Sequence, residues 1–130
     1  MKKIDVVAAL IRKDDGVLIA KRATGDKNVL GKWEFPGGKI EHGESEMTAI
    51  EREIKEEFEI EIKANKNLIN NVYKYPTKTI NLKLIECFYI SGKFNLHDHT
   101  EYKFVAANEL LDYDLAEADI PLAEYVKEMK

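Results

Sequence analysis

The sequence predicts an α/β fold, in which a mixed β-sheet is sandwiched between α-helices. Residues 5–12 and 17–23 form two nearly continuous apolar segments, which are typical of strands buried on both faces. Residues 45–58 show a helical pattern with one apolar stripe, and a second helix is expected from about Pro121, a favourable first-turn residue. Helices early and late among strands indicate a layered sheet with helices on both sides.

Local signals justify the first elements in turn. The two apolar segments are joined by Asp14, Asp15 and Gly16, which favour a tight turn. Residues 33–39, WEFPGGK, are interrupted by proline and glycine, so we expect a rigid loop there rather than a regular element. Ser45 is a candidate N-cap for the helix that follows.

The second half of the chain continues with strands. Residues 68–75 and 79–91 predict two long strands, separated at Pro76. A shorter strand over residues 102–106 leads into a small helix at residues 107–113. These segments complete the predicted sheet.

Composition bounds the class of protein. Apolar residues make up 45% and charged residues 34% of the 130 residues, so we expect a single globular domain over residues 1–130. No apolar run approaches the ~18 residues of a membrane span, and the lone Cys87 cannot form an internal disulfide, so a cytoplasmic protein is expected. The net charge of −4 argues against binding a nucleic-acid polymer. A monomer or weak homodimer is expected.

The predicted helix at residues 45–58 gathers acidic side chains beside its apolar stripe. The stripe consists of Met47, Ile50, Ile54 and Phe58. At ~100° per residue, Glu53, Glu56 and Glu57 fall on the neighbouring arc, with Glu57 nearest the stripe. Because Arg52 and Lys55 project to its sides, this acidic arc is expected to lack basic partners. Clustered carboxylates suit a hard divalent cation such as Mg²⁺; a solvated acidic face is the alternative.

Two glycines precede this helix. Gly37 and Gly38 allow unusual backbone dihedrals and close approach, so main-chain groups can face a ligand; a simple turn is the alternative. The phosphate-loop pattern G-x-x-x-x-G-K-[ST] is absent from the sequence, which excludes a P-loop NTPase.

The spacing of these residues resembles a known motif. From Gly38 the order is glycine, five residues, Glu44, seven residues, then REIKEE at residues 52–57. This resembles the Nudix box, G-x5-E-x7-R-E-U-x-E-E-x-G-U with U aliphatic. WEFPGGKIE is similar to MutT-type members, and the tail DLAEADIPLAEYV to CTP pyrophosphohydrolases of that branch. Glu59 departs from the motif, which has a helix-ending glycine there; a left-handed Glu59 would cost ~1 kcal/mol, or the helix ends differently.

The resemblance implies a Nudix fold and a hydrolase that acts on phosphorus anhydrides with Mg²⁺, or Mn²⁺ as a substitute. The implied catalytic and metal-binding residues are Gly37, Glu44, Arg52, Glu53, Glu56, Glu57 and Asp98. The three glutamates of the acidic arc and the Gly37 carbonyl would hold the metal, Arg52 would hold the carboxylates, and Glu44 would orient that arginine or a ligand. Asp98 would bind a metal or position the water, unless it is merely an exposed loop acid. The flanking His97 and His99 form only a weak metal signal.

The resemblance also implies a nucleotide site. The implied substrate-binding residues are Arg22, Glu34, Phe35, Gly38, Lys39 and Asp119. Arg22, with Lys21, would meet phosphates, unless both are plain surface charges. Asp119 holds the place of a base-reading residue, with a helix N-cap as the alternative; ionised it suits the cytosine amine, and protonated it serves oxidised guanine as well. Candidates to stack on a base, or to pack in the core, are Trp33, Phe35, Tyr73 and Tyr75.

These observations lead to one expectation and three alternatives. We expect a house-cleaning pyrophosphohydrolase that sanitises the nucleotide pool by converting 8-oxo-dGTP or CTP/dCTP-type triphosphates to monophosphate and pyrophosphate. One alternative is another Nudix diphosphatase, such as an ADP-ribose pyrophosphatase, for which Pro76 is the one sequence feature. The others are a non-catalytic nucleotide-binding module and an acidic scaffold protein, in which neutralising Glu56 and Glu57 would do no harm.

Overall fold

The computed structural model describes residues 3–25 and 27–129. Within them, seven strands form one sheet in the order β3-β2-β1-β6-β5, with β4 paired to β1 and β7 to β2. The strands are β1 (Lys3–Lys13), β2 (Gly16–Arg22), β3 (Trp33–Glu34), β4 (Gly37–Lys39), β5 (Glu61–Tyr75), β6 (Lys78–Ser91) and β7 (His99–Ala106). The β1–β6 pairing is parallel and the other pairings of these strands are antiparallel, so the sheet is mixed, as predicted.

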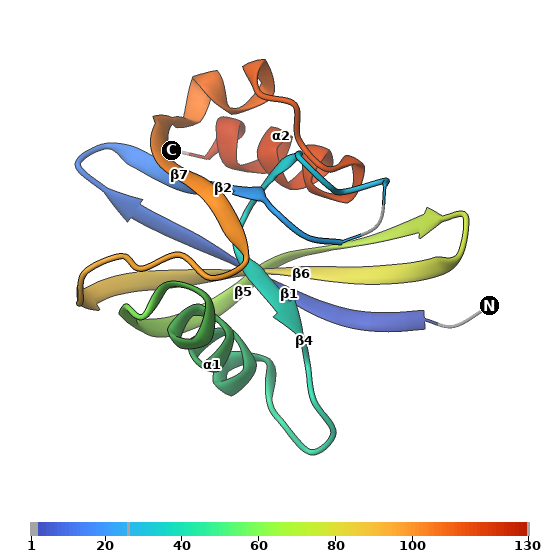
Figure 1. Cartoon of the computed structure of the whole chain (residues 1–130), viewed down its shortest axis with the longest axis horizontal. Helices are drawn as coiled ribbons and strands as arrows, with labels where there is room; N and C mark the ends of the chain where they lie inside the picture. Colours follow the sequence, from blue (N-terminus) through green and yellow to red (C-terminus); the bar gives the residue numbers. More distant parts are fainter. Residues whose placement is uncertain (1–2, 26, 130) are drawn as a thin grey trace.

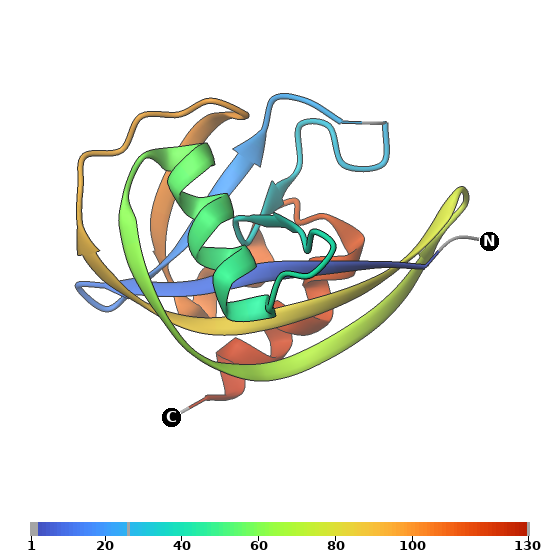
Figure 2. The ribbon, with the colours of Figure 1, turned by 90° about the horizontal axis from the view of Figure 1, so that it is seen from below.

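Helices cover both sides of the sheet. They are α1 (Glu46–Phe58), the 3-10 helices η1 (Ala107–Asp112) and η2 (Glu117–Asp119), and α2 (Ile120–Glu128). Figure 1 shows α1 on one side of the strands and α2 with the short helices on the other, and Figure 2 shows the same separation after a turn of 90°. The predicted fold class is confirmed. No helix of the described ranges is long and apolar enough to span a membrane.

Strand β1 divides the core into two clusters. Ala8 and Leu10 pack in the cluster that contains Leu122 of α2, whereas Ala9 and Ile11 pack in the cluster that contains Ile54 of α1. Because alternate residues of a strand face opposite sides, a central strand covered by helices on both sides must be apolar throughout. The continuous apolar pattern of residues 5–12 has this cause.

Two tight turns connect the long strands. Asp14 and Asp15 have positive φ values of 51° and 67° between β1 and β2, as a two-residue type I′ hairpin turn requires. At the far end of the β5–β6 hairpin, Tyr75 pairs with Lys78, which leaves Pro76 and the following threonine as a two-residue turn. The turn explains Pro76 without reference to substrate.

The structure corrects several predicted boundaries. The segment at residues 33–39 is not a plain loop, because β3 pairs with β2 and β4 pairs with β1 around Pro36. Strand β5 begins at Glu61 and β7 at His99, both earlier than predicted, and the small helix at residues 107–113 is a 3-10 helix. Pairing with strands far away in the sequence supplies the backbone hydrogen bonds of these segments, and local composition does not reveal such pairing.

Candidate active site

Helix α1 brings the three glutamates of the acidic arc to one side at different depths. Glu57 is 6% exposed, Glu53 is half-buried, and the side chain of Glu56 is 59% exposed. Positions i, i+3 and i+4 share one side of a helix, which explains the grouping. The helix begins after the predicted N-cap, Ser45, whose Oγ accepts a hydrogen bond from the backbone N–H of Thr48 at 3.1 Å. The acidic arc therefore runs from the buried side of α1 to its exposed side.

Arg52 lies at the centre of the carboxylates. Its Nη1 donates to Glu53 Oε1 at 2.8 Å and to Glu56 Oε1 at 3.1 Å, while Nε and Nη2 donate to the two oxygens of Glu44 at 2.7 and 2.9 Å. Nη2 also donates to the Lys39 carbonyl at 3.1 Å. The expectation that the acidic arc lacks a basic partner is therefore wrong. The long guanidinium side chain reaches across the arc from a position that a helical projection places at its side.

These bonds fix the charge of the Glu44–Arg52 pair. The hydrogen bond from Arg52 is the main cause that lowers the pKa of Glu44 to about 2, and the backbone N–H of Glu41 contributes next. In return, Glu44 is the main cause that raises the pKa of Arg52 above its already high ordinary value. The position of Glu44 is that of a residue that orients the arginine.

Glu57 carries a buried carboxylate in negatively charged surroundings. Its Oε1 is buried and has no hydrogen-bond partner within the described residues. Burial, followed by the charges of Glu34, Glu53 and Asp98, raises the pKa of Glu57 to about 9. Burial is also the main cause that raises the pKa of Glu53. A cation bound beside these carboxylates would favour their charged forms and offset the cost of burial.

The two glycines of β4 let backbone and carboxylates approach closely. A Cβ at Gly37 would lie 1.9 Å from the Val7 carbonyl oxygen, and a Cβ at Gly38 would lie 2.1 Å from Glu53 Oε2. Neither glycine has a positive φ, so the predicted unusual dihedrals are wrong. The close approach observed is to other parts of the protein, and approach of this backbone to a ligand stays a prediction. The absent side chain of Gly38 leaves the Glu53 carboxylate against the backbone of β4.

The donor set suits a divalent cation, although it is not assembled around one. Within residues 3–25 and 27–129, no three His, Cys, Asp or Glu side chains already form a group that could hold a metal ion. Glu53 and Glu56 instead accept hydrogen bonds from Arg52. Oxygen donors, and a buried Glu57 Oε1 without a partner, are nevertheless what a hard cation requires. Metal binding by these residues and by the Gly37 carbonyl stays a prediction.

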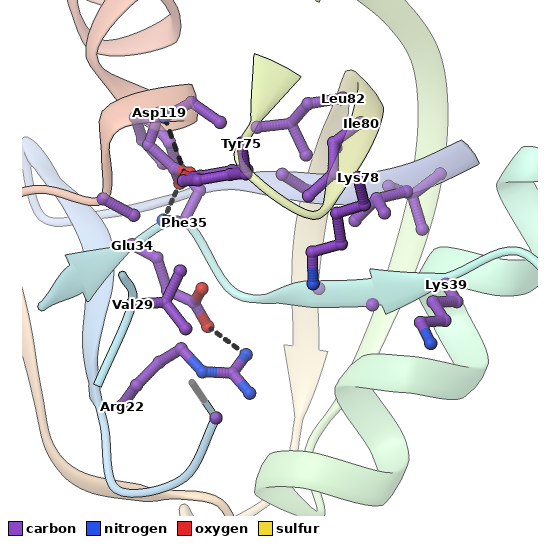
Figure 3. A pocket seen from close by; sticks show the side chains of 18 residues that line it. Arg22, Val29, Glu34, Phe35, Lys39, Tyr75, Lys78, Ile80, Leu82 and Asp119 are labelled. Atoms are coloured by element: carbon purple, nitrogen blue, oxygen red, sulfur yellow. Dashed lines mark hydrogen bonds and ion pairs between the residues drawn. The ribbon is translucent and has the colours of Figure 1, made fainter. Parts of the chain in front are cut away.

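A cavity of about 200 Å³ opens beside the acidic arc, between β4, the β5–β6 turn and η2. Figure 3 shows its polar side chains arriving from several separate elements. All six residues predicted to bind substrate line it: Arg22, Glu34, Phe35, Gly38, Lys39 and Asp119. Their role in binding stays a prediction, but the fold brings them together from segments nearly one hundred positions apart.

All four aromatic candidates pack in or against one core cluster, and two of them, Phe35 and Tyr75, also line the cavity. Trp33 packs edge-to-face against Tyr113, with ring centroids 5.4 Å apart, and Tyr73 packs against Tyr75 at 4.8 Å. Sequence reasoning missed Lys78, which lines the cavity from the β5–β6 turn (Figure 3). The two-residue turn at Pro76 is the only sequence signal that could have placed this lysine near β4.

Asp119 lies at the bottom of the cavity and is 5% exposed. Its Oδ2 accepts a hydrogen bond from the backbone N–H of Phe35 at 2.9 Å, and its side chain makes no capping bond to α2. Asp119 therefore occupies the N-cap position of α2, as the alternative predicted, but its side chain does not cap the helix. Burial, followed by the charge of Glu34, raises the pKa of Asp119 well above its usual range. The protonated form, which can both donate and accept, is thereby favoured.

Glu34 is held from two sides at the rim of the cavity. Its Oε2 accepts from Arg22 Nη1 at 3.4 Å and from His99 Nε2 at 3.0 Å. A register shift in the β2–β7 pairing sets His99 opposite Arg22, and the imidazole stacks on Phe58 at the end of α1. Sequence reasoning missed this role of His99, because the H-x-H pattern suggested only a weak metal signal.

Asp98 lies near Glu57 of the acidic arc, in the segment between β6 and β7. Asp98 is exposed, and its carbonyl accepts a hydrogen bond from the Ala23 N–H at 3.0 Å. Its charge contributes to the raised pKa of Glu57. The side chain of His97 bonds the carboxylate of Glu59 rather than a carboxylate of the acidic arc. Lys21 pairs with Glu101 at 3.9 Å and, unlike Arg22, does not line the cavity.

Comparison with known proteins supplies a family. The NUDIX domain family matches residues 1–126. The chain is 36% identical to the CTP pyrophosphohydrolase of Escherichia coli over 124 residues, which cover 95% of this chain and 91% of that protein. It is 34% identical to the 8-oxo-dGTP diphosphatase of the same organism over 82 residues, covering 63% and 64% of the two chains. The solution structure of the Escherichia coli ORF135 protein superposes with a TM-score of 0.84 at 35% identity, covering 95% of this chain and 88% of that one.

Proposed function

The chain belongs to the Nudix family, and on that premise we propose that it is a Mg²⁺-dependent nucleoside triphosphate pyrophosphohydrolase of the MutT type. Its products would be a nucleoside monophosphate and pyrophosphate. The relatives named above are pyrophosphohydrolases and diphosphatases, which supports hydrolysis of a phosphorus anhydride. Removal of damaged or surplus nucleotides is the corresponding cellular role.

One observation carries the proposal: the cavity and the acidic arc meet at Gly38. This residue lines the cavity, and its missing Cβ is the space against which the Glu53 carboxylate packs. A nucleoside in the cavity would therefore extend its polyphosphate over β4 toward the carboxylates of α1. Carboxylates alone would repel a polyphosphate, so a cation between them is required.

The residues of the chain divide the chemistry between them. Glu53, Glu56 and Glu57, with the Gly37 carbonyl, would hold Mg²⁺ or, as a substitute, Mn²⁺. When bound, the cation supplies charge neutralisation at the polyphosphate and activation of water. Arg52 keeps the carboxylates aligned through its bonds to Glu53 and Glu56.

The remaining polar residues would bind substrate and water. Arg22, Lys39 and Lys78 offer cationic groups at the rim of the cavity, and Asp98 would orient the attacking water from its loop. Figure 3 shows the side chains of Arg22 and Lys78 entering the cavity from different parts of the chain. Arg22, Lys39 and Lys78 lie on strands of the sheet, whereas Asp98 precedes β7.

The base would be bound between Phe35, Tyr75 and Asp119. The two rings line the cavity together with apolar residues of β1 and β6, and the Asp119 carboxyl is the buried polar group among them. A carboxyl that is kept protonated presents a donor and an acceptor, which pairs with cytosine or with the O6 and N7–H edge of 8-oxoguanine. CTP-type nucleotides and 8-oxo-dGTP are therefore the leading substrates.

A substrate panel tests the proposal. Pyrophosphate release would be measured with Mg²⁺ from CTP, dCTP, 5-methyl-dCTP, 8-oxo-dGTP, dGTP and ADP-ribose, with phosphorus NMR identifying the products. We expect one or two of the first four nucleotides to be cleaved to monophosphate and pyrophosphate. Cleavage of ADP-ribose alone would favour the alternative of an ADP-ribose pyrophosphatase. The one sequence feature in favour of that alternative, Pro76, is explained by the β5–β6 turn. Tight nucleotide binding without any turnover would favour the binding module.

Substitution of Asp119 separates the two leading bases. The side-chain amide in the D119N variant would still accept the hydrogen bond from Phe35 N–H but would carry a permanent donor. We expect D119N to raise the ratio of kcat/KM for 8-oxo-dGTP to kcat/KM for CTP by about tenfold, the change that ~1.4 kcal/mol of hydrogen bonding produces. An unchanged ratio of kcat/KM values would show that Asp119 does not contact the base.

A further inference from the structure

Glu59 ends helix α1 in a conformation that suits glycine. Its φ and ψ are 58° and 28°, in the left-handed region, and its backbone N–H donates to the Lys55 carbonyl at 3.0 Å. An L-residue is strained in this conformation, whereas glycine is not. The chain therefore has a strained residue at the position where the Nudix box has glycine. The contacts of the Glu59 carboxylate suggest what this side chain contributes in return.

The side chain of Glu59 holds the segment that precedes β7. Its Oε2 accepts a hydrogen bond from Asn95 Nδ2 at 2.9 Å and a second from His97 Nε2. The backbone of the same segment donates to the last carbonyls of α1, from Asn95 N–H to Phe58 at 3.0 Å and from His97 N–H to Glu57 at 3.3 Å. Residues 92–98 are thus bound to the end of α1 through both their backbone and their side chains.

Close packing at the start of the segment strengthens this attachment. A Cβ at Gly92 would lie 2.9 Å from the Cα of Ile60 and 3.0 Å from the carbonyl oxygen of Glu59, so the segment leaves β6 in contact with the same helix end. It finishes at Asp98, whose charge acts on Glu57 and whose carbonyl accepts from Ala23 N–H. Asp98 is therefore held between the end of α1 on one side and the end of β2 on the other.

We propose that Glu59 is a positioning residue, whose carboxylate tethers residues 92–98 to the end of α1 and so holds Asp98 beside the acidic arc. The tether itself depends only on the contacts described above, whereas its effect on turnover rests on the proposed function. Glu59 and His97 are each 47% exposed in their side chains, so their bond is screened by solvent and contributes mainly to geometry. A glycine would relieve the backbone strain but could not form the tether.

Three substitutions at Glu59 separate the tether from the backbone strain. E59Q keeps one acceptor oxygen, and both side-chain bonds go to a single oxygen in the native protein, so the tether is expected to survive. E59A removes the tether and keeps the strained conformation. E59G removes both the tether and the strain. E61Q, a matched charge change at an exposed position of β5, is the control.

The exchange rates of the Asn95 and His97 backbone amides measure the strength of the tether in the metal-free protein. We expect the Asn95 and His97 amides of E59A and E59G to exchange about tenfold faster than those of the native protein, and those of E59Q and E61Q within about twofold of it. H97A should accelerate the Asn95 amide, and the combined E59A/H97A variant should add little to either single change. Unchanged protection in E59A and E59G would overturn the tether.

The variants at Glu59 are expected to rank differently in thermal stability and in kcat. E59G should unfold about 3 °C or more above E59A, because glycine is unstrained in the left-handed region. With the best triphosphate of the panel, kcat should fall about tenfold in both variants, with little change in KM, and should recover in E59Q. Turnover that follows thermal stability, with E59G as fast as the native protein, would overturn the positioning role. Absence of turnover in the native protein would instead contradict the proposed function, and the exchange data would still decide the tether.

Discussion

Glu57 and Asp119 are both nearly fully buried acids, and they lie at the two ends of the region where substrate is proposed to bind. Glu57 has an oxygen without a hydrogen-bond partner within the described residues, whereas Asp119 accepts one bond from the Phe35 N–H. Burial is the largest cause of the raised pKa of each carboxyl. A buried acid of this kind destabilises the free protein and is retained where a ligand needs it.

Neutralising Glu57 is expected to change stability and turnover in opposite directions. The folded-state pKa of about 9 exceeds the ordinary value of 4.5, so the stability contributed by the neutral carboxyl is complete below about pH 4.5 and is lost as the pH rises toward 9. E57Q stays neutral and should therefore be more stable than the native protein at pH 8 in EDTA, on the order of 2 kcal/mol by urea unfolding. Its cation-dependent hydrolysis should fall at least about a hundredfold.

Glu61 supplies the control for this substitution. E61Q makes the same charge change at an exposed position of β5, and we expect its turnover to match that of the native protein. If E57Q is less stable than the native protein in EDTA and retains full activity, Glu57 is a structural residue and the proposed role is wrong.

The raised pKa of Asp119 predicts a pH-dependent difference between the native protein and D119N. Because the folded pKa lies well above the ordinary value of 3.8, the native protein is expected to lose stability relative to D119N as the pH rises above about 4. Urea unfolding at pH 5, 6.5 and 8 in EDTA should show a gap that widens to roughly 1–3 kcal/mol.

Alanine at the same position removes the hydrogen-bond acceptor as well as the charge. D119A leaves the buried N–H of Phe35 without its acceptor, so it should be less stable than D119N at every pH. A native–D119N difference that stays constant with pH would mean that Asp119 is not protonated in the folded protein.

At the scale of elements, strand β4 joins the cavity to helix α1. Its three residues pair with Val6, Val7 and Ala8 of β1, and its two glycines face different neighbours. Gly37 packs against the backbone of β1, whereas Gly38 packs against the end of a flexible side chain, Glu53. The first neighbour cannot move without breaking the sheet, and the second can.

Alanine at each glycine should therefore have a different effect. G37A places a Cβ at 1.9 Å from the Val7 carbonyl oxygen and should lower the free energy of unfolding by about 3 kcal/mol. G38A displaces the Glu53 carboxylate and should lower stability by less than about 1 kcal/mol while slowing hydrolysis about tenfold or more. Thermal unfolding of both variants and kcat of G38A check the prediction, and equal losses of stability in G37A and G38A, or native turnover in G38A, would contradict it.

The sequence predicted the elements whose pattern repeats within one segment. The apolar pattern of β1 and the helical period of α1 can each be recognised within a single segment, and both elements form. Helix α1 also begins at the predicted cap, Ser45. The short strands β3 and β4 depend on partners elsewhere in the chain, and the segment WEFPGGK carries no period of its own. The bonds of Arg52 were missed for a related reason, because a helical projection gives directions and not the reach of a side chain.

At the scale of the whole molecule, the sheet positions distant segments around one cavity. Arg22 ends β2, Glu34 ends β3, Lys78 begins β6, and Asp119 ends η2, yet all four line the same space. The resemblance placed three of these residues in a common site, while the cavity itself follows from strand order. The role of His99 could not be predicted from the sequence. Its bond to Glu34 depends on a register shift that exists only once β2 and β7 have paired.

The central claim is that the carboxylates of α1 hold a divalent cation for hydrolysis of a nucleoside triphosphate. The most direct test is the rate of pyrophosphate release from the best nucleotide of the panel as Mg²⁺ is titrated into native protein, E57Q and E61Q. We predict saturable cation dependence in the native protein and E61Q, with E57Q slower by at least about a hundredfold at every concentration. Equal rates in E57Q and the native protein, or hydrolysis that persists in EDTA, would contradict the account.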